Sequence, residues 1–253
     1  MNNKHYPIMI PDIYNYCDRW CERCSFIQAC AIGSKKTYIK YNNPREEPFD
    51  EDVSGVLQTI YDIIQDISLE NHAETPIQSE GDTIKHDIKV VEVARLYTKM
   101  VNAWFEKNTS IFEDKSLELI EHIEKGLKTE TETIKHATAF GECYEIIQWY
   151  INFIYIKFCR ATTCKSEVIS DEKQAFLQSD SNGSAKIALL AAEKSLAAWV
   201  QMMYFMPDKA DDMLDILGTL QKIIRLGDAE FPDARAFKRA GFDTPSPVFN
   251  TFI

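Results

Sequence analysis

Apolar residues recur every three or four positions along most of this chain, which is the spacing of one face of an α-helix. The first clear stripe is Val56, Ile60, Ile64 and Ile67, and comparable stripes follow toward the carboxyl end. About five to six helices are therefore expected. They span residues 52–68, 82–106, 110–126, 129–160, 184–205 and 208–226.

Two of these helices carry a specific start signal. Ser110 is followed three residues later by Glu113, and Thr129 by Glu132, and both pairs match the capping box. Gly126 stands where the helix that Ser110 opens is expected to end. Gly227 likewise predicts that the last helix ends at Leu226.

The helix over 129–160 differs from the others because it is apolar on nearly every side from Ile146 to Phe158. A helix of this kind is typical of the centre of a bundle. We therefore expect Trp149, Phe153 and Ile154 to be nearly buried.

Two stretches lack helical periodicity. Residues 162–183 are polar and predict a long loop with one helical turn near Gln174. Residues 228–253 form an aromatic tail that is expected to fold back over the bundle. Its phenylalanines are Phe231, Phe237, Phe242, Phe249 and Phe252.

The pattern predicts an all-α protein, an antiparallel helical bundle with a small N-terminal Cys-rich metal-binding segment and an extended C-terminal tail. The expected divisions are residues 1–48, 49–227 and 228–253. Composition agrees, because 9 glycines and 9 prolines in 253 residues are too few for the many turns of a sandwich or barrel.

Charge narrows the range of partners. The chain has 28 Lys and Arg against 39 Asp and Glu, a net charge of −11, which disfavours nucleic acid and anionic membranes as broad partners. The most hydrophobic stretch of the chain is too short to span a bilayer. The polar N-terminus lacks the apolar core of a secretory signal. We expect a cytoplasmic protein that needs no membrane; a protein partner and the oligomeric state stay open.

The strongest chemical signal is a cluster of cysteines. Four of the seven cysteines lie within fourteen residues, with the spacing C-x3-C-x2-C-x5-C. In a chain without an export signal, such a cluster predicts metal or redox chemistry rather than a disulfide framework. The expected metal ligands are Cys17, Cys21, Cys24 and Cys30.

The identity of the metal stays open between an iron–sulfur cluster and zinc. Closely spaced cysteines followed by one more favour a [4Fe–4S] cluster. Zinc more often uses two C-x2-C pairs, and only Cys21 and Cys24 form one here. If Cys17, Cys21 and Cys24 lay on one helix, Cys17 and Cys24 would be roughly 10 Å apart along its axis, too far for one zinc ion. Arg19 and Arg23 could neutralise thiolate charge, and Trp20 and Phe26 could shield the centre.

The first three cysteines also resemble the C-x3-C-x2-C cluster motif of radical SAM enzymes. The resemblance covers eight residues and implies a [4Fe–4S] cluster on Cys17, Cys21 and Cys24. Arg23 stands where those enzymes have an aromatic residue, and the body of the chain offers no strands for their barrel.

The central helix holds the other candidates. Glu142, Glu145, Gln148 and Asn152 fall on one arc of it, either as an exposed edge or as a polar pocket with Glu145 as acid or base. The leading hypothesis is a metal-binding protein with an N-terminal four-cysteine site, most simply a [4Fe–4S] cluster with a redox, sensing or structural role. The alternatives are a zinc-braced bundle that acts as an enzyme through Glu142 and Glu145, or an interaction module.

Overall fold

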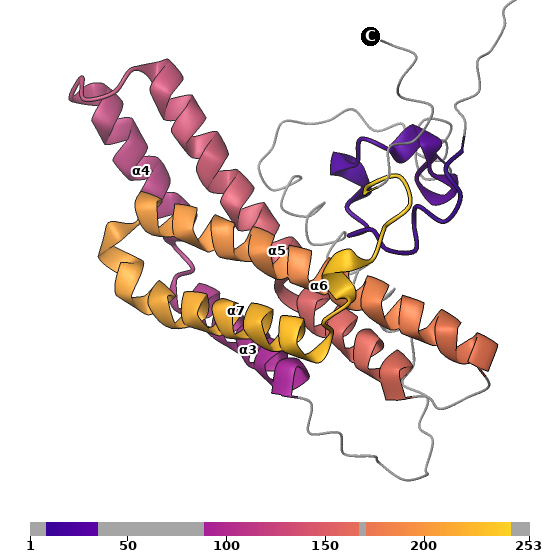
Figure 1. Ribbon diagram of the computed structural model, residues 1–253. Coiled ribbons are helices and arrows are strands. Elements are labelled where there is room, and N and C mark those ends of the chain that lie inside the picture. Colours follow the sequence, from indigo (N-terminus) through magenta and orange to yellow (C-terminus); the bar gives the residue numbers. More distant parts are fainter. Residues whose placement is uncertain (1–8, 35–88, 167–170, 244–253) are drawn as a thin grey trace, which may run out of the picture. The chain divides into compact units, whose positions relative to one another are not determined.

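The computed structural model describes residues 9–34, 89–166 and 171–243 (Figure 1). This part of the chain is helical and contains no strand, as the pattern predicts. The predicted helix over 52–68 and the division near residue 48 lie outside the described residues. The long helices are α3 (Lys89–Lys107), α4 (Ile111–Glu124), α5 (Glu130–Ser166), α6 (Asp171–Phe205) and α7 (Ala210–Glu230).

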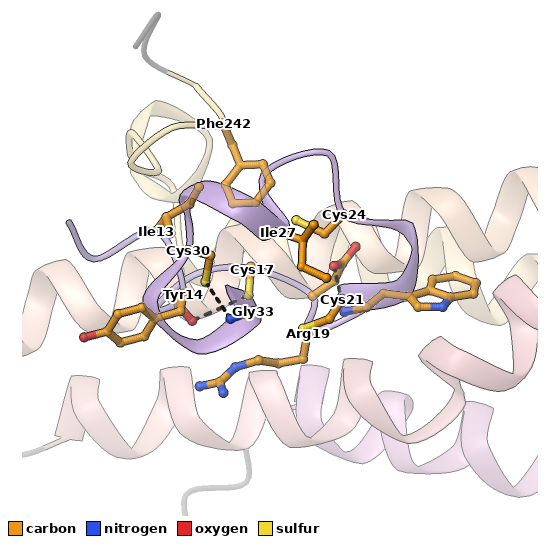
Figure 2. Close-up of a pocket in the computed structure, with 12 residues that line it drawn as sticks. Ile13, Tyr14, Cys17, Arg19, Cys21, Cys24, Ile27, Cys30, Gly33 and Phe242 are labelled. Carbon is orange, nitrogen blue, oxygen red and sulfur yellow. Dashed lines mark hydrogen bonds between the residues drawn. The ribbon is translucent and has the colours of Figure 1, made fainter. Parts of the chain in front are cut away.

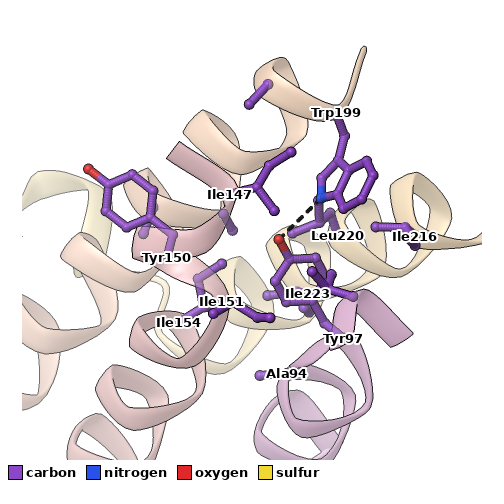
Figure 3. Close-up of a cluster of buried hydrophobic side chains, with 14 of the residues drawn as sticks. Ala94, Tyr97, Ile147, Tyr150, Ile151, Ile154, Trp199, Ile216, Leu220 and Ile223 are labelled. Atoms are coloured by element: carbon purple, nitrogen blue, oxygen red, sulfur yellow. Dashed lines mark hydrogen bonds between the residues drawn. The ribbon is translucent and has the colours of Figure 1, made fainter. Parts of the chain in front are cut away.

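Helices α3, α5, α6 and α7 share one hydrophobic core (Figure 3). Tyr97, Ile147, Trp199 and Leu220, one from each of these helices, are all fully buried. The indole N–H of Trp199 donates to the hydroxyl of Tyr97 at 3.4 Å, so both polar atoms have a partner inside the core. Each apolar side chain buried in this way contributes about 1.5–3 kcal/mol, so the four-helix core dominates the stability of the fold.

Helices α5 and α6 run antiparallel. Near the end of α5, Arg160 pairs with Asp180 at 2.9 Å, and Asp180 lies early in α6. Near the start of α5, the rings of Phe140 and Phe205 are 5.8 Å apart, and Phe205 ends α6. Contacts that reverse in this order along two consecutive helices define an antiparallel pair.

Of the two predicted capping boxes, one forms in the structure and the other does not. Thr129 and Glu132 form the full capping box. The backbone N–H of Thr129 donates to the Glu132 carboxylate at 2.9 Å, and the backbone N–H of Glu132 donates to the Thr129 hydroxyl at 3.3 Å. The hydroxyl of Ser110 instead donates to Asp114 at 2.8 Å and does not cap the helix. Gly126 has a φ of +65° just past α4, so it ends that helix as expected.

The apolar middle of α5 is only partly enclosed by the bundle. Ile154 is fully buried as predicted, but the prediction that Trp149 and Phe153 are nearly buried is wrong, because both are half-buried. The ring of Trp149 instead stacks on Trp20 of the N-terminal segment, with centroids 5.0 Å apart. Helix α5 is apolar on an additional side because a second part of the chain packs there.

The predicted loop over 162–183 is also wrong. Helix α5 continues to Ser166 and α6 begins at Asp171, so most of this polar stretch is helical. Some of its described polar side chains have partners between the two helices: Ser181, for example, donates to the carbonyl of Ala161 at 2.8 Å. Part of the polarity that resembled a loop therefore belongs to buried contacts between α5 and α6.

Gly227 does not end the last helix, which continues to Glu230. A Cβ atom at Gly227 would lie 2.8 Å from both Leu189 and Phe158. The glycine is therefore required because α7 approaches α5 and α6 closely at this point. It allows the helices to pack and does not mark the end of α7.

The described part of the tail folds back on its own chain, as expected. Phe231 is buried and lies 6.3 Å from the ring of Phe158 in α5. Phe237 meets Tyr16 edge-on at 4.7 Å, and Phe242 meets Phe26 at 5.1 Å. The tail thus covers both the bundle and the N-terminal segment, while Phe249 and Phe252 lie outside the described residues.

Candidate metal centre

The cysteine segment, residues 9–34, does not form one helix. It runs through a turn that reaches Cys17, a 3-10 helix η1 (Cys21–Arg23) and a second 3-10 helix η2 (Ile27–Ala29). Cys24 and Cys30 are the residues that end η1 and η2. The expected separation of Cys17 and Cys24 along a helix axis therefore does not apply, and neither does the objection to zinc based on it.

The chain brings all four predicted ligands to one pocket (Figure 2). The cavity has a volume of about 20 Å³. Ile13, Ile27 and Phe242 supply apolar walls. Cys30 is buried, and Cys17, Cys21 and Cys24 are half-buried.

Two sulfurs make contacts with the local backbone. The N–H of Gly33 donates to Sγ of Cys30 at 3.4 Å, and the thiol of Cys17 donates to the carbonyl of Tyr14 at 3.5 Å (Figure 2). A Cβ at Gly33 would lie 3.0 Å from Ile27, so a glycine lets the backbone come this close. The contact to Cys30 is the kind of N–H···S bond that tunes a metal-bound thiolate.

The sulfurs are close enough to influence one another's charge. Burial raises the pKa of the Cys24 thiol, and negative charge on Cys17, Asp18 and Cys30 adds to the increase. A cation between the sulfurs would reverse this effect, because it favours the thiolate form.

The thiols do not converge on one point. Within the described residues, no group of three or more Cys, His, Asp or Glu side chains is arranged to hold a single metal ion. No disulfide joins any of the seven cysteines, all of which belong to the described ranges. The four cysteines line one pocket, but in this part of the chain their thiols are not arranged as the ligands of a metal centre.

The two arginines of the motif take different positions. Arg19 lines the pocket, with a left-handed backbone φ of +60°. Arg23 lies over the ring of Trp20 at 4.4 Å and pairs with Glu145 of α5. The expectation that an arginine neutralises thiolate charge is thus compatible with Arg19, whereas Arg23 joins the segment to the bundle.

Asp18 is the residue that attaches the cysteine segment to α5 and α6, and sequence reasoning missed it. Its carbonyl accepts the indole N–H of Trp149 at 2.9 Å. Its carboxylate accepts the hydroxyl of Tyr150 at 2.6 Å and pairs with Lys194 at 3.1 Å. Burial alone would raise the pKa of Asp18, but these partners outweigh it and lower the pKa. The signal available in the sequence was an acidic residue directly after Cys17, close to the aromatic residues Tyr16 and Trp20.

A second attachment lies on the other side of Cys17. The hydroxyl of Tyr16 donates to Asp180 at 3.0 Å, and Arg160 donates to the same carboxylate. The ring of Tyr16 lies against Gly183, where a Cβ would be only 2.4 Å away. The position of Cys17 is therefore fixed by contacts of both of its neighbours with the bundle.

The other candidate residues do not join this pocket. Glu142 and Glu145 are exposed on α5, and Glu145 pairs with Arg23. Cys143 is buried in the core, while Cys159 and Cys164 are half-buried. The thiol of Cys164 donates to Asp180 at 3.1 Å.

No protein family, curated protein or solved structure matches this chain. The helices of the described ranges include none that is both long enough and apolar enough to cross a bilayer.

Proposed function

We propose that this chain is a cytoplasmic metal-binding protein in which Cys17, Cys21, Cys24 and Cys30 hold a [4Fe–4S] cluster with a redox, sensing or structural role. One observation carries the proposal: four thiols from a single short segment line one pocket. Thiolates are the usual protein ligands of iron–sulfur clusters, and such segments commonly supply several of them in close succession.

Zinc and a cubane cluster place different demands on the spacing of four thiolates. Four sulfurs at the Zn–S distance of about 2.3 Å stand only about 3.8 Å from one another. The described residues include no such converging group. A cubane binds each thiolate at a different iron, so it requires sulfurs that stand farther apart than those around one zinc ion.

The surroundings of the pocket also suit a cluster. Ile13, Ile27 and Phe242 limit contact with water, and Gly33 donates an N–H to the sulfur of Cys30. Solvent exposure and hydrogen bonds to sulfur are among the main determinants of cluster reduction potential. The chain thus supplies two means of adjusting a redox centre.

Zinc is the second candidate, and two observations favour it. The cysteine segment follows 3-10 turns, so no helix holds Cys17 and Cys24 apart. The pocket lined by the four cysteines has a volume of about 20 Å³, room for about one water-sized sphere. A zinc ion would act as a brace for the segment, and would require the thiols to turn inward.

The test is metal content in matched cysteine variants after anaerobic purification. Cys21→Ala should lose the bound metal while most of the helical circular dichroism remains, because the bundle core is built from other residues. Cys143→Ala is the control and should keep the metal. Full metal retention in Cys21→Ala would refute the assignment of this ligand set, and a colourless wild-type protein with one zinc per chain would replace the cluster by the structural alternative.

A further inference from the structure

A second pocket lies directly beside the four-cysteine pocket. It has a volume of about 410 Å³ and shares two lining residues, Asp18 and Phe242, with the cysteine pocket. Most of its other lining residues come from α6, so we name it the α6 pocket. Pockets for small molecules range from about 300 to 1,000 Å³, and this one is within that range.

One part of the α6 pocket is apolar. Ile187, Leu190 and Ala191 of α6 line it, together with the ring of Phe242 from the tail. These side chains offer no hydrogen bond, so they suit the hydrocarbon part of a ligand.

The polar part offers hydrogen-bond donors. The Lys194 ammonium has three N–H groups, and its contacts within the described chain use two of them, on Asp18 at 3.1 Å and on Tyr150 at 2.9 Å. Arg239 uses Nε and Nη2 on Asp243, at 3.0 and 2.9 Å. The described residues take up neither the third N–H of Lys194 nor the Nη1 group of Arg239.

Each of the two carboxylates that line the pocket is paired with a cation, Asp18 with Lys194 and Glu193 with Arg235. The Asp18 carboxylate accepts hydrogen bonds from Tyr150, Lys194 and the Trp20 N–H. Glu193 accepts from Arg235 at 2.6 Å. A ligand therefore meets spare donors next to an apolar surface, and an acceptor group with a full negative charge forms the strongest bonds to such donors.

We propose that the α6 pocket binds a small molecule with a carboxylate at one end and an apolar body. The carboxylate lies between Lys194 and Arg239, and the body lies on Leu190 and Phe242. Binding itself does not depend on a metal. The further consequence, that the ligand lies next to the centre held by the four cysteines, rests on the proposed function.

Isothermal titration with a matched pair of probes tests the ligand class. Phenylbutyrate and phenylbutanol share the same body, and only the first carries a carboxylate. A hydrogen bond to a charged group contributes about 1.5–3 kcal/mol, so wild-type protein should bind the acid at least about tenfold more tightly than the alcohol. Lys194→Met should remove most of this preference. Equal binding of acid and alcohol, or no binding of phenylbutyrate, hexanoate or butyrate at millimolar concentration, would overturn the proposal.

A second pair of variants tests the location without changing any charge. Ala197 lines the α6 pocket and is exposed, so Ala197→Phe should fill the pocket and weaken phenylbutyrate binding by about tenfold or more without disturbing the core. Val200 is exposed on the same helix and does not line the pocket, so Val200→Phe should leave binding unchanged. Equal effects of the two substitutions would place the binding site elsewhere.

Metal content measured on the same samples separates the two proposals. Phenylbutyrate binding in a protein without metal would count against the proposed function alone. A metal-loaded protein that binds none of the three acids would count against the α6 pocket alone.

Discussion

At the residue scale, Asp18 links the cysteine segment to the bundle through two helices. Asp18→Asn keeps the size of the side chain and its backbone carbonyl, but removes the charge that pairs with Lys194. We expect a loss of about 1 kcal/mol in the free energy of unfolding, the usual difference between a hydrogen bond to a charged group and one to a neutral group. Chemical denaturation followed by tryptophan fluorescence measures this loss.

Asp12→Asn is the matched control for that substitution. Asp12 is exposed, and its side chain accepts only a local bond from Asn15 at 3.3 Å. Surface changes of this kind usually stay within about 0.5 kcal/mol. Equal losses in the two variants would show that the contacts of Asp18 with Tyr150 and Lys194 do not hold the segment in place.

Asp180 predicts a pH dependence of stability. Burial alone would raise its pKa, but hydrogen bonds from Arg160, Cys164 and Tyr16 outweigh burial and hold the pKa below its ordinary value. A carboxylate with a lowered folded-state pKa stabilises the protein fully above the unfolded pKa of about 3.9. Its contribution is lost as the pH falls through the folded pKa.

The measurement compares wild type with Asp180→Asn by denaturation across pH. At about pH 7 the variant should be less stable by about 1–3 kcal/mol. The difference should shrink once the pH falls below about 3.9, since the unfolded wild-type chain then takes up the proton first. A difference that stays constant, or grows, down to about pH 2 would contradict the assignment to this carboxylate.

At the scale of the elements, helix α7 contains two glycines with opposite requirements. A Cβ at Gly227 would come within 2.8 Å of Leu189 and Phe158, whereas a Cβ at Gly218 would meet nothing within 4 Å. Gly227→Ala should therefore destabilise the protein by about 1–3 kcal/mol through overpacking. Gly218→Ala should stabilise it by about 0.5–1 kcal/mol, because alanine favours the helix.

Thermal or urea unfolding of the two alanine variants checks this expectation in one helix. Opposite signs are the expected result. Two stabilised variants would mean that α7 does not approach α5 and α6 as closely as the structure has it.

Glycines and one capping box explain which helix boundaries could be predicted from the sequence and which could not. The stripes of apolar residues identify α3 to α7, and Thr129 with Glu132 marks the start of α5. Gly227 and the polar run before Gly183 misled the prediction, because a glycine at a helix crossing and a glycine past a helix end look alike in a sequence. Only the positions of Phe158 and Tyr16 in space distinguish them.

At the scale of the whole molecule, the spacing of the four cysteines is enough to propose them as metal ligands. The residues that surround them could not be predicted from the sequence. The partners of Asp18 on α5 and α6 are 131 to 176 residues away along the chain, at Trp149, Tyr150 and Lys194. No local pattern encodes such contacts. The excess apolar surface of α5 around Trp149 was a sign that a further part of the chain packs there. The α6 pocket arises in the same way, from residues of four separate segments.

Bundle and cysteine segment have separate sources of stability. The bundle has a hydrophobic core, whereas the segment depends on polar contacts, a few aromatic rings and, by our proposal, a metal. Because thiolate ligation couples metal binding to local folding, removal of the metal should loosen the segment before the bundle.

The iron and acid-labile sulfide content of the anaerobically purified wild-type chain tests the central claim most directly. The account predicts a brown protein with about four irons and about four sulfides per chain, as a [4Fe–4S] cluster requires. A folded protein without iron would contradict it, and one that carries neither iron nor zinc would leave Cys17, Cys21, Cys24 and Cys30 as packing residues.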